Sequence, residues 1–529
     1  MRTTFCHVKI ITPELPGRPS ETLEWSGPDG VDTLPGLSDV DVTTSIDSIV
    51  NHFALHFAPV RFGRADSIAE RVPAYSLVFI DGGVHGDEAD PTLMVGLTDP
   101  AIEAEQWTPQ GPQRHITIGG RGIECVLADA RVFWAPYLET HKLSAGEYDA
   151  RIADEFLEEI TGQLIWAKKI VGEDMDPRQA VLAILFYYLT KHSSAVMNIL
   201  LPGDLKIRHL LMPSGYTPQQ IDANLERFPP KPGVRYDMPA DWTFIGDALG
   251  LTKLTLPTAT MHPQPGPVLN MLMSVVDHEF HDFFVRYERD HDGKGAPRAR
   301  LVHRIKPFLR VASVGSAVRA VLAGVERSMS RRPQMSQFYA AEPSLETVEI
   351  TSGDVMASQL AHGMRDIRNV FSVQPAQGAF FENDEFKSLV PPRFAGKRSD
   401  YAYFGRYGIR PLEHVTPHFV VGRDGATDEK LILHAADTMA DTLKRWYDPH
   451  PVMIEGTIQV LGRSAYRAGQ RLVWHGRDEN GDLDGRPTRE FYVTHVQHRY
   501  GAATGAFIST LMVTRGWTIA EPATPMGVS

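Results

Sequence analysis

The residues best suited to chemistry in this chain lie in the run His278-Glu279-Phe280-His281-Asp282. On a helix, His278, His281 and Asp282 would stand at positions i, i+3 and i+4, so they would share one face. Two imidazoles and a carboxylate on one face could bind a metal ion such as zinc. The pattern differs from the His-Glu-x-x-His of zinc proteases, because the second histidine comes one residue early. The alternative is the polar face of an amphipathic helix, and the sequence favours that interpretation.

Three other motifs have the residue types of a functional site without its spacing. The run His85-Gly86-Asp87-Glu88 with Asp90 lacks the alternating oxygen ligands of a calcium loop. The run Gly119-Gly120-Arg121-Gly122 has neither the Lys-Ser/Thr nor the βαβ context of a phosphate loop. The run Gly462-Arg463-Ser464-Ala465-Tyr466 lacks the final glycine of a nucleophile elbow. We therefore predict no catalytic residues, no cofactor-binding or metal-binding residues, no cofactor and no enzymatic activity.

The composition indicates an acidic globular protein. The 529 residues include 53 basic and 65 acidic side chains, and the net charge is −12. This balance argues against specific nucleic-acid binding through phosphate contacts, although a negative surface would let DNA pass nearby without sticking. The two cysteines, Cys6 and Cys125, form no metal or redox motif, so a reducing compartment is expected. The most apolar run, 180–189, is about half of a bilayer span, and no signal peptide opens the chain, so we expect a soluble protein.

The elements that would position these residues follow from periodicity. Alternating apolar and polar residues predict strands near both ends of the chain, for example at Phe53, Leu55 and Phe57. Residues 120–129 read as the last strand of the first group. A capping residue followed by proline starts a predicted helix at Asp176-Pro177, and the same signal recurs at Thr217-Pro218.

The remaining elements complete an α+β, multidomain fold class. A helix is predicted at 152–160, a helix and a strand hairpin at 267–304, and another helix at 431–447. We thus predict two antiparallel β-barrel domains, an α-rich insertion and a helix-plus-hairpin middle segment. The predicted segments are an N-terminal arm or edge strand (1–36), an N-terminal barrel (37–144), the α-rich insertion (145–260), the helix and hairpin (261–375), an irregular segment with a helix (376–450), the C-terminal barrel portion (451–518) and a tail (519–529).

Several runs recur in a familiar order along the chain. In the N-terminal part they are 93–97, 116–121 and 126–129, with Gly122 standing where an aspartate is usual. The middle and C-terminal runs are 269–284, with Leu269 in place of a tryptophan, then 304–308, 354–373, 407–410, 456–473, 491–500 and 509–516. In this order the chain resembles the baseplate (tail) hub proteins of tailed bacteriophages and related contractile injection systems.

The resemblance implies a structural role. It implies a homotrimer whose two barrel domains per chain form a pseudo-sixfold ring, which adapts the hexameric tail tube to the trimeric central spike and lines the DNA or effector channel. The implied partners are the tail tube protein, the central spike protein, other baseplate (wedge) proteins and the tape measure protein. The implied location is the virion tail baseplate, after assembly in the host bacterial cytoplasm. The alternative function is a tail-associated hydrolase, either metal-dependent at His278, His281 and Asp282 or peptidoglycan-degrading.

Overall fold

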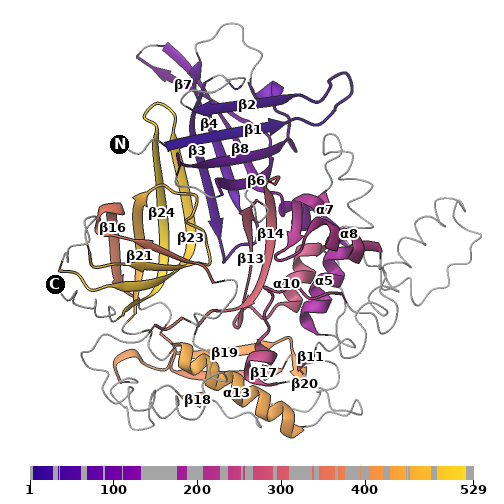
Figure 1. The fold of residues 1–529 in the computed structure, drawn as a ribbon, viewed down its shortest axis with the longest axis vertical. Coiled ribbons are helices and arrows are strands. Elements are labelled where there is room, and N and C mark those ends of the chain that lie inside the picture. The colour runs from indigo at the N-terminus through magenta and orange to yellow at the C-terminus, as the bar shows by residue number, and fades with distance from the viewer. Residues whose placement is uncertain are drawn as a thin grey trace, which may run out of the picture.

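The fold is known from a computed structural model of the chain (Figure 1). The structure describes residues 4–27, 34, 36–60, 68–86, 90–109, 111–132, 176–187, 207–226, 236–251, 254–255, 266–289, 295–308, 336–338, 345–363, 367–375, 393–394, 405–420, 429–447, 450, 453–477 and 485–519.

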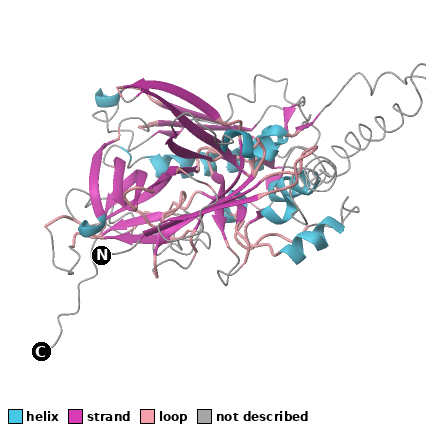
Figure 2. Ribbon diagram, turned by 90° about the horizontal axis from the view of Figure 1, so that it is seen from above, coloured by secondary structure: helices cyan, strands magenta, loops and turns pink. Residues whose placement is uncertain are grey.

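One large curled sheet of 14 described strands organises the molecule (Figures 1 and 2). Its principal strand order is β16-β21-β24-β23-β3-β4-β8-β6-β5-β1-β2, and β7, β15 and β22 pair beside this path. The N-terminal strands are β1 (Thr4–Ile11), β2 (Thr22–Gly27), β3 (Leu37–Ser45), β4 (His52–Val60), β5 (Leu77–Val84), β6 (Thr92–Thr98), β7 (Ile102–Thr108) and β8 (Gly111–Gly122). The C-terminal strands are β15 (Thr347–Ile350), β16 (Val355–His362), β21 (Ile454–Leu461), β22 (Arg471–Trp474), β23 (Arg489–Gly501) and β24 (Ala506–Thr518).

The two halves of the sheet join where β23 pairs antiparallel with β3. Their register runs from His495 opposite Ser45 to Gly501 opposite Asp39. The antiparallel strands predicted near both ends of the chain are therefore confirmed, but the strands assigned to two separate barrels belong to one sheet. The N-terminal segment is also more than an arm, because β1 lies between β5 and β2. The boundaries of the seven segments stay predictions.

The alternation of apolar and polar residues predicts the strands correctly, but it misplaces the end of one strand. Phe53, Leu55 and Phe57 of β4 are buried, as their spacing predicts. The strand predicted over 120–129 is wrong after Gly122, because Cys125–Asp129 is a helix, α2. The reason is that the backbone bonds to itself here, as in the hydrogen bond from the Ala130 N–H to the Val126 carbonyl at 3.0 Å, and not to a neighbouring strand.

Several helices from the middle of the chain gather on one side of the large sheet (Figure 1). The two predicted capping signals are confirmed. The Asp176 carboxylate accepts the N–H of Arg178 at 2.8 Å, and Thr217 and Gln220 form a reciprocal capping box. The helices are α1 (Ile68–Arg71), α5 (Pro177–Tyr187), α7 (Ile207–Leu210), α8 (Pro218–Glu226), α9 (Ile245–Leu249) and α10 (Val268–Val275), and η3 (Ser352–Asp354) is a 3-10 turn. The helix predicted at 152–160 lies outside the described residues.

The apolar run that begins at Ala180 forms a core helix. Its residues from Ala180 to Phe186 are all buried within α5. Among the described residues, no helix combines the length and the apolar character that crossing a membrane would need.

A hairpin of β13 (His281–Glu288) and β14 (Arg298–Ile305) lies at the centre of the molecule (Figure 1). It confirms the predicted hairpin, and β10 (Leu211–Pro213) extends it as a parallel third strand. Beyond it lies a smaller unit, here called the α13 module, made of residues 367–375, 393–394, 405–420 and 429–447. Its elements are β17 (Val370–Pro375), β18 (Arg393–Phe394), β19 (Pro411–Thr416), β20 (Phe419–Val420) and α13 (Glu429–Tyr447), which confirms the helix predicted at 431–447. The short pairs β11 (Leu254–Thr255) with β20 and β9 (Arg131–Val132) with β12 (Gly266–Pro267) complete the described elements.

Adjacent glycines in β8 provide a test of the packing. A methyl group on Gly120 would overlap the Phe53 ring and the Leu97 carbonyl, whereas one on Gly119 would meet nothing within 4 Å. We expect Gly120→Ala to lower the free energy of unfolding by about 1–3 kcal/mol, the usual cost of overpacking. The matched variant Gly119→Ala should change it by less than about 0.5 kcal/mol. Chemical denaturation measures both, and equal effects would contradict this packing.

Candidate functional site

The central hairpin is the place where distant parts of the chain meet through charged side chains. Arg286 and Arg304 lie on its strands and Arg289 directly follows β13, and all three are at least largely buried. Burying a guanidinium costs free energy unless it is paired and hydrogen-bonded. Each of these arginines therefore needs an acceptor from another segment, and the acceptors come from both halves of the sheet.

At the tip of the hairpin, two of the predicted motifs come together. The Asp90 carboxylate accepts the Arg467 guanidinium at 2.9 Å and the backbone N–H of Arg289 at 3.0 Å. The Arg289 side chain also pairs with Asp81 at 2.6 Å. In addition, the Ser464 hydroxyl donates to the Asp90 backbone carbonyl at 2.6 Å. Asp90 and Ser464 thus fasten the C-terminal loop to the N-terminal sheet, while Asp87 and Glu88 lie outside the described residues.

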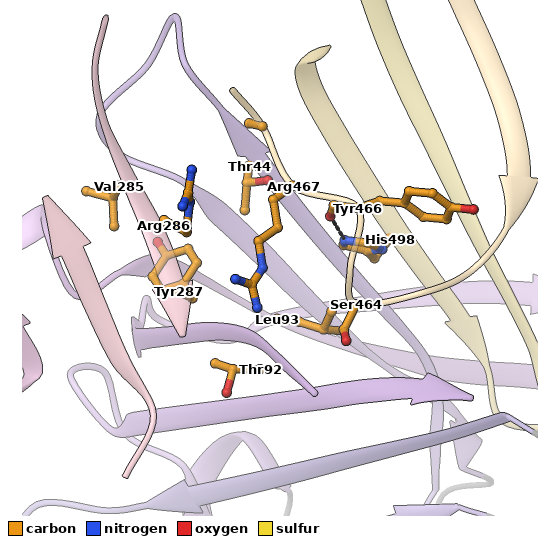
Figure 3. A pocket seen from close by; sticks show the side chains of 11 residues that line it. Thr44, Thr92, Leu93, Val285, Arg286, Tyr287, Ser464, Tyr466, Arg467 and His498 are labelled. Atoms are coloured by element: carbon orange, nitrogen blue, oxygen red, sulfur yellow. Dashed lines mark hydrogen bonds between the residues drawn. The ribbon is translucent and has the colours of Figure 1, made fainter. Parts of the chain in front are cut away.

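A small cavity beside this contact resembles a serine–histidine site only at first sight (Figure 3). Its volume of about 20 Å³ leaves room for roughly one water molecule. Ser464 and His498 both line it, but each is engaged elsewhere. His498 Nδ1 lies 2.8 Å from the Ser509 hydroxyl, and its Nε2 lies 3.1 Å from the Tyr466 carbonyl. Burial lowers the pKa of His498 to about 4, so the ring is neutral at pH 7.

At the base of the hairpin, opposite its tip, Arg304 is fully buried and holds β23 and the C-terminal loop. Its guanidinium lies 3.5 Å from the Asp282 carboxylate and donates to the Tyr492 hydroxyl at 2.9 Å. It also donates to the Gly469 carbonyl, and the Tyr492 hydroxyl donates to Asp282. Burial raises the pKa of Tyr492 well above its ordinary value, so the phenol stays protonated. Four groups from three segments thus depend on one another.

The same hairpin contacts a buried carboxyl group of the N-terminal sheet. The Glu124 carboxyl accepts the Tyr287 hydroxyl at 2.7 Å and the backbone N–H of Asn51 at 2.9 Å. The Asn51 side-chain amide donates to Tyr287 at 3.1 Å, which closes a three-residue network. Burial raises the pKa of Glu124 to about 7, despite these hydrogen bonds.

A further ion pair joins β22 to β23 in the C-terminal half of the sheet. The Glu490 carboxylate lies 2.8 Å from the Arg471 guanidinium, and it accepts the Gln337 N–H at 2.7 Å. Arg286 of the hairpin reaches Glu346 at 2.9 Å, and Glu346 also accepts the Gln470 side chain at 2.9 Å. These contacts join Gln337 to β23, and Glu346 to both the hairpin and the loop before β22.

The structure separates the three residues predicted for a metal site. The helix expected to carry them is wrong after Val275, because Val276 is extended, residues 278–280 form a turn and β13 begins at His281. His281 and Asp282 are consecutive in a strand, so their side chains point to opposite faces. His278 is exposed in the turn. Among the described residues, no group of three or more His, Cys, Asp or Glu side chains is placed to hold a metal ion.

The predicted glycine-rich run is part of a strand. Residues 119–122 form the end of β8, and Arg121 pairs with Asp129 at 2.9 Å and with Asp99 at 3.1 Å. A side chain at Gly122 would overlap the carboxyl group of Glu124 and the Tyr287 hydroxyl, so the glycine permits that network. Sequence analysis missed Glu124, Asn51 and the hairpin arginines. The available signal was the presence of charged residues inside the otherwise apolar strands 281–288 and 298–305.

Comparisons with known proteins agree with the family predicted from the sequence. No family model and no curated protein matches the chain. Among solved structures, a 43 kDa tail protein of prophage MuSo2 from Shewanella oneidensis is similar at 10% identity and a TM-score of 0.42, over 97% of this chain and 98% of that chain. A tail protein from Neisseria meningitidis MC58 is similar at 8% identity and a TM-score of 0.42, over 96% of each chain. The E. coli c3393 protein, described as a type VI secretion component similar to T4 tail proteins gp27 and gp5, is similar at 8% identity and a TM-score of 0.32, over 93% of this chain and 77% of that chain.

The solved structures similar to this chain are thus tail and secretion-system proteins, the same class of protein that the chain resembles in sequence. The TM-scores are all below 0.5, and likenesses of this extent carry nothing about assembly, partners or activity to this chain.

The buried Glu124 carboxyl predicts an unusual pH dependence. Its folded pKa of about 7 exceeds the ordinary 4.5, so the protonated form stabilises the fold below about pH 4.5 and this contribution is lost as the pH rises through 7. The difference corresponds to on the order of 3 kcal/mol. Glu124→Gln should remove this loss, so its melting temperature relative to wild type should be higher at pH 8 than at pH 5. The exposed Glu413→Gln variant is the control, and parallel pH profiles for Glu124→Gln and wild type would contradict the prediction.

The buried Arg304 network predicts a coupled pair. Arg304→Met should lower the free energy of unfolding by about 3–5 kcal/mol, because Asp282 is left buried without its cation. The double variant Asp282→Asn with Arg304→Met should recover part of this loss. As a control, Arg499→Met removes an exposed ion pair with Asp39 and should cost less than about 1 kcal/mol. Urea denaturation measures all three, and similar losses for Arg304→Met and Arg499→Met would be the contrary result.

Proposed function

We propose that this protein is a structural baseplate hub of a phage tail or contractile injection machine. The observation that carries the proposal is the single curled sheet, which joins strands from both ends of the chain and has β16 and β2 at the ends of its principal strand order. A sheet of this kind is suited to assembly, because each terminal strand offers backbone N–H and C=O groups to another chain. The order of family-like runs in the sequence supports the same role.

The β16 end of the sheet is the more accessible of the two terminal strands. Six of its eight residues are exposed, and Met356 is 53% exposed. β16 pairs with β21 along one edge, and within the described residues no strand pairs with its other edge. Its sequence is also uncharged apart from His362, so it lacks the lysines that commonly protect such edges.

On this proposal the subunit assembles as a homotrimer. A contact between two different surfaces of the same chain closes into a ring when the rotation is 120°. The ring would adapt the hexameric tail tube to the trimeric spike and line the channel, with the tube protein, the spike protein, wedge proteins and the tape measure protein as its partners. Its place would be the tail baseplate of the virion, after assembly in the host cytoplasm.

The internal charges support a structural role over the hydrolase alternative. The buried or partly buried acids and bases of the hairpin junction pair across sequence-distant segments, as in Asp90 with Arg467 and Asp81 with Arg289. The geometry that the metal-dependent alternative requires of His278, His281 and Asp282 is not formed, because the three side chains do not share a helix face.

The assembly proposal is tested by the mass of the recombinant protein in solution. We expect a trimer by light scattering, and a smaller species when lysines are placed on the edge strand in the double variant Ala357→Lys with Ala361→Lys. Ala503→Lys, in the exposed β23–β24 turn, is the matched control and should leave the trimer intact. A stable wild-type monomer at high concentration would contradict the proposal, and an unaffected trimer in the double variant would exclude β16 from the interface.

A further inference from the structure

Four histidines gather where the α13 module meets the central hairpin. His281 and His303 lie on the hairpin strands, His414 lies on β19, and His418 directly precedes β20. Three of them, His281, His303 and His418, are each about 1% exposed. This histidine cluster surrounds the buried Asp277, which lies in the turn between α10 and β13.

Asp277 binds the α13 module directly. Its carboxylate lies 2.8 Å from His414 Nε2 and accepts the Thr416 hydroxyl at 2.6 Å. His418 Nε2 lies 2.8 Å from the carbonyl of Val275, two residues before Asp277. The polar contacts between module and hairpin thus depend on a few imidazoles and one carboxylate.

The hydrogen bonds of His281 fit a neutral ring. Its Nδ1 lies 3.1 Å from the Asp277 carbonyl, which can only accept, so Nδ1 carries the proton. Its Nε2 accepts the backbone N–H of Ile245 at 3.1 Å, at the first residue of α9. A second proton on Nε2 would face this N–H donor, and the hydrogen bond would be lost. Protonation of His281 is therefore incompatible with the observed start of α9.

The surroundings of His303 disfavour a protonated ring even more than those of His281. Among the described residues neither of its ring nitrogens has a hydrogen-bond partner. Its ring stacks on His281 at 4.9 Å and meets the edges of Trp242 and Phe283. An imidazolium in this apolar environment would be buried without an acceptor, which is costly.

A cation already stands at the other end of the same stack. The Arg178 guanidinium lies over the Phe244 ring at 5.5 Å, Phe244 stacks on His281 at 5.6 Å, and His281 stacks on His303. A positive charge on either histidine would be repelled by Arg178. The other charged or titratable groups that face the cluster are Asp176 and Asp247, both paired with Arg178, together with Asp277, His278, Glu279 and Lys306.

We propose that the histidine cluster is an acid-sensitive link, which holds the α13 module and α9 on the hairpin near neutral pH and releases them on acidification. The electrostatics agree with the geometry. Burial lowers the pKa of His281 to about 3, and it also lowers the pKa values of His303 and His418. Burial alone would raise the pKa of Asp277, but the hydrogen bond from His414 and the charges of His414 and His418 keep it below its ordinary value.

The sign of the effect follows from these directions. A histidine whose folded pKa lies below its unfolded pKa of about 6.5 contributes stability that is fully present above pH 6.5 and is lost as the pH falls. The opposite end of the hairpin responds in the other direction, because Glu124 is stabilised by protonation. Acid should therefore loosen the α13 module while the junction with the N-terminal sheet stays closed.

Hydrogen exchange on the full chain tests this link, with peptides compared at about pH 7.5 and about pH 5 after correction for intrinsic exchange. For His281 alone, the ordinary pKa of 6.5 and the folded value of about 3 predict a rise of about thirtyfold in the open population at pH 5. We expect this loss of protection in residues 245–251 and 405–420, while the β23–β24 hairpin stays protected. Unchanged protection of 245–251 and 405–420, or a parallel loss in β23–β24, would overturn the proposal.

A pair of variants separates the cluster from other histidines. His303→Phe removes a titratable group but keeps an aromatic ring in the stack, so it should weaken the acid response. His434→Phe changes an exposed histidine of α13 and should respond like wild type. Equal acid responses in the two variants would overturn the proposal, and the wild-type comparison decides the question if His303→Phe does not fold.

Discussion

The pairing of buried charges on the central hairpin is the constraint on which the rest of the structure depends. Arg304 has no exposed surface, and its acceptors are Asp282, Tyr492 and the Gly469 carbonyl. A guanidinium in such a place is tolerated only when its hydrogen bonds are complete, so the hairpin, β23 and the loop before β22 must form together. The tip of the hairpin is constrained in a similar way, because the Asp90 carboxylate accepts hydrogen bonds from both the Arg289 backbone and the Arg467 side chain. The network therefore makes the fold cooperative across segments that are far apart in sequence.

The pairing of β3 with β23 places a second demand on the chain. Asp39 lies opposite Gly501, so this contact closes a loop of more than 400 residues. Closing such a loop costs chain entropy before the contact gives any stabilisation. The hairpin reduces this difficulty, because Tyr287 reaches Glu124 in the first half while Arg304 reaches Tyr492 in the second. The hairpin thus connects the two halves independently of the β3–β23 pairing.

Local periodicity explains which parts of the fold could be predicted from the sequence. The strand with Phe53, Leu55 and Phe57 and the helices that start at Pro177 and Pro218 depend on neighbouring residues, and their patterns predict them correctly. The end of α10 could not be predicted in this way, because the side chains of residues 278–282 suit a helix as well as a turn and a strand. What decides the outcome is the partner of His281, which is the backbone of Ile245, and the partners of Asp282, which include Tyr492 from 210 residues away. Residue type alone thus identified the candidate site residues, but their structural roles could be assigned only from the tertiary contacts.

The distribution of these contacts also determines where the molecule can move. Shifting the C-terminal half against the N-terminal half would break the β3–β23 ladder together with the ion pair of Asp90 with Arg467, and a largely buried charge left alone is costly. Within the described residues, no strand of the α13 module pairs with the large sheet. Asp277, aromatic contacts such as Phe280 with Trp446, and a hydrogen bond from Arg515 of β24 to the Trp446 carbonyl hold the module in place. Burial keeps the rings of His281 and His303 neutral in the closed contact, so between pH 5 and 7 they take up protons only when the contact opens. Motion and its control by protons are therefore expected at the same boundary, while the sheet that carries the exposed β16 edge keeps its shape.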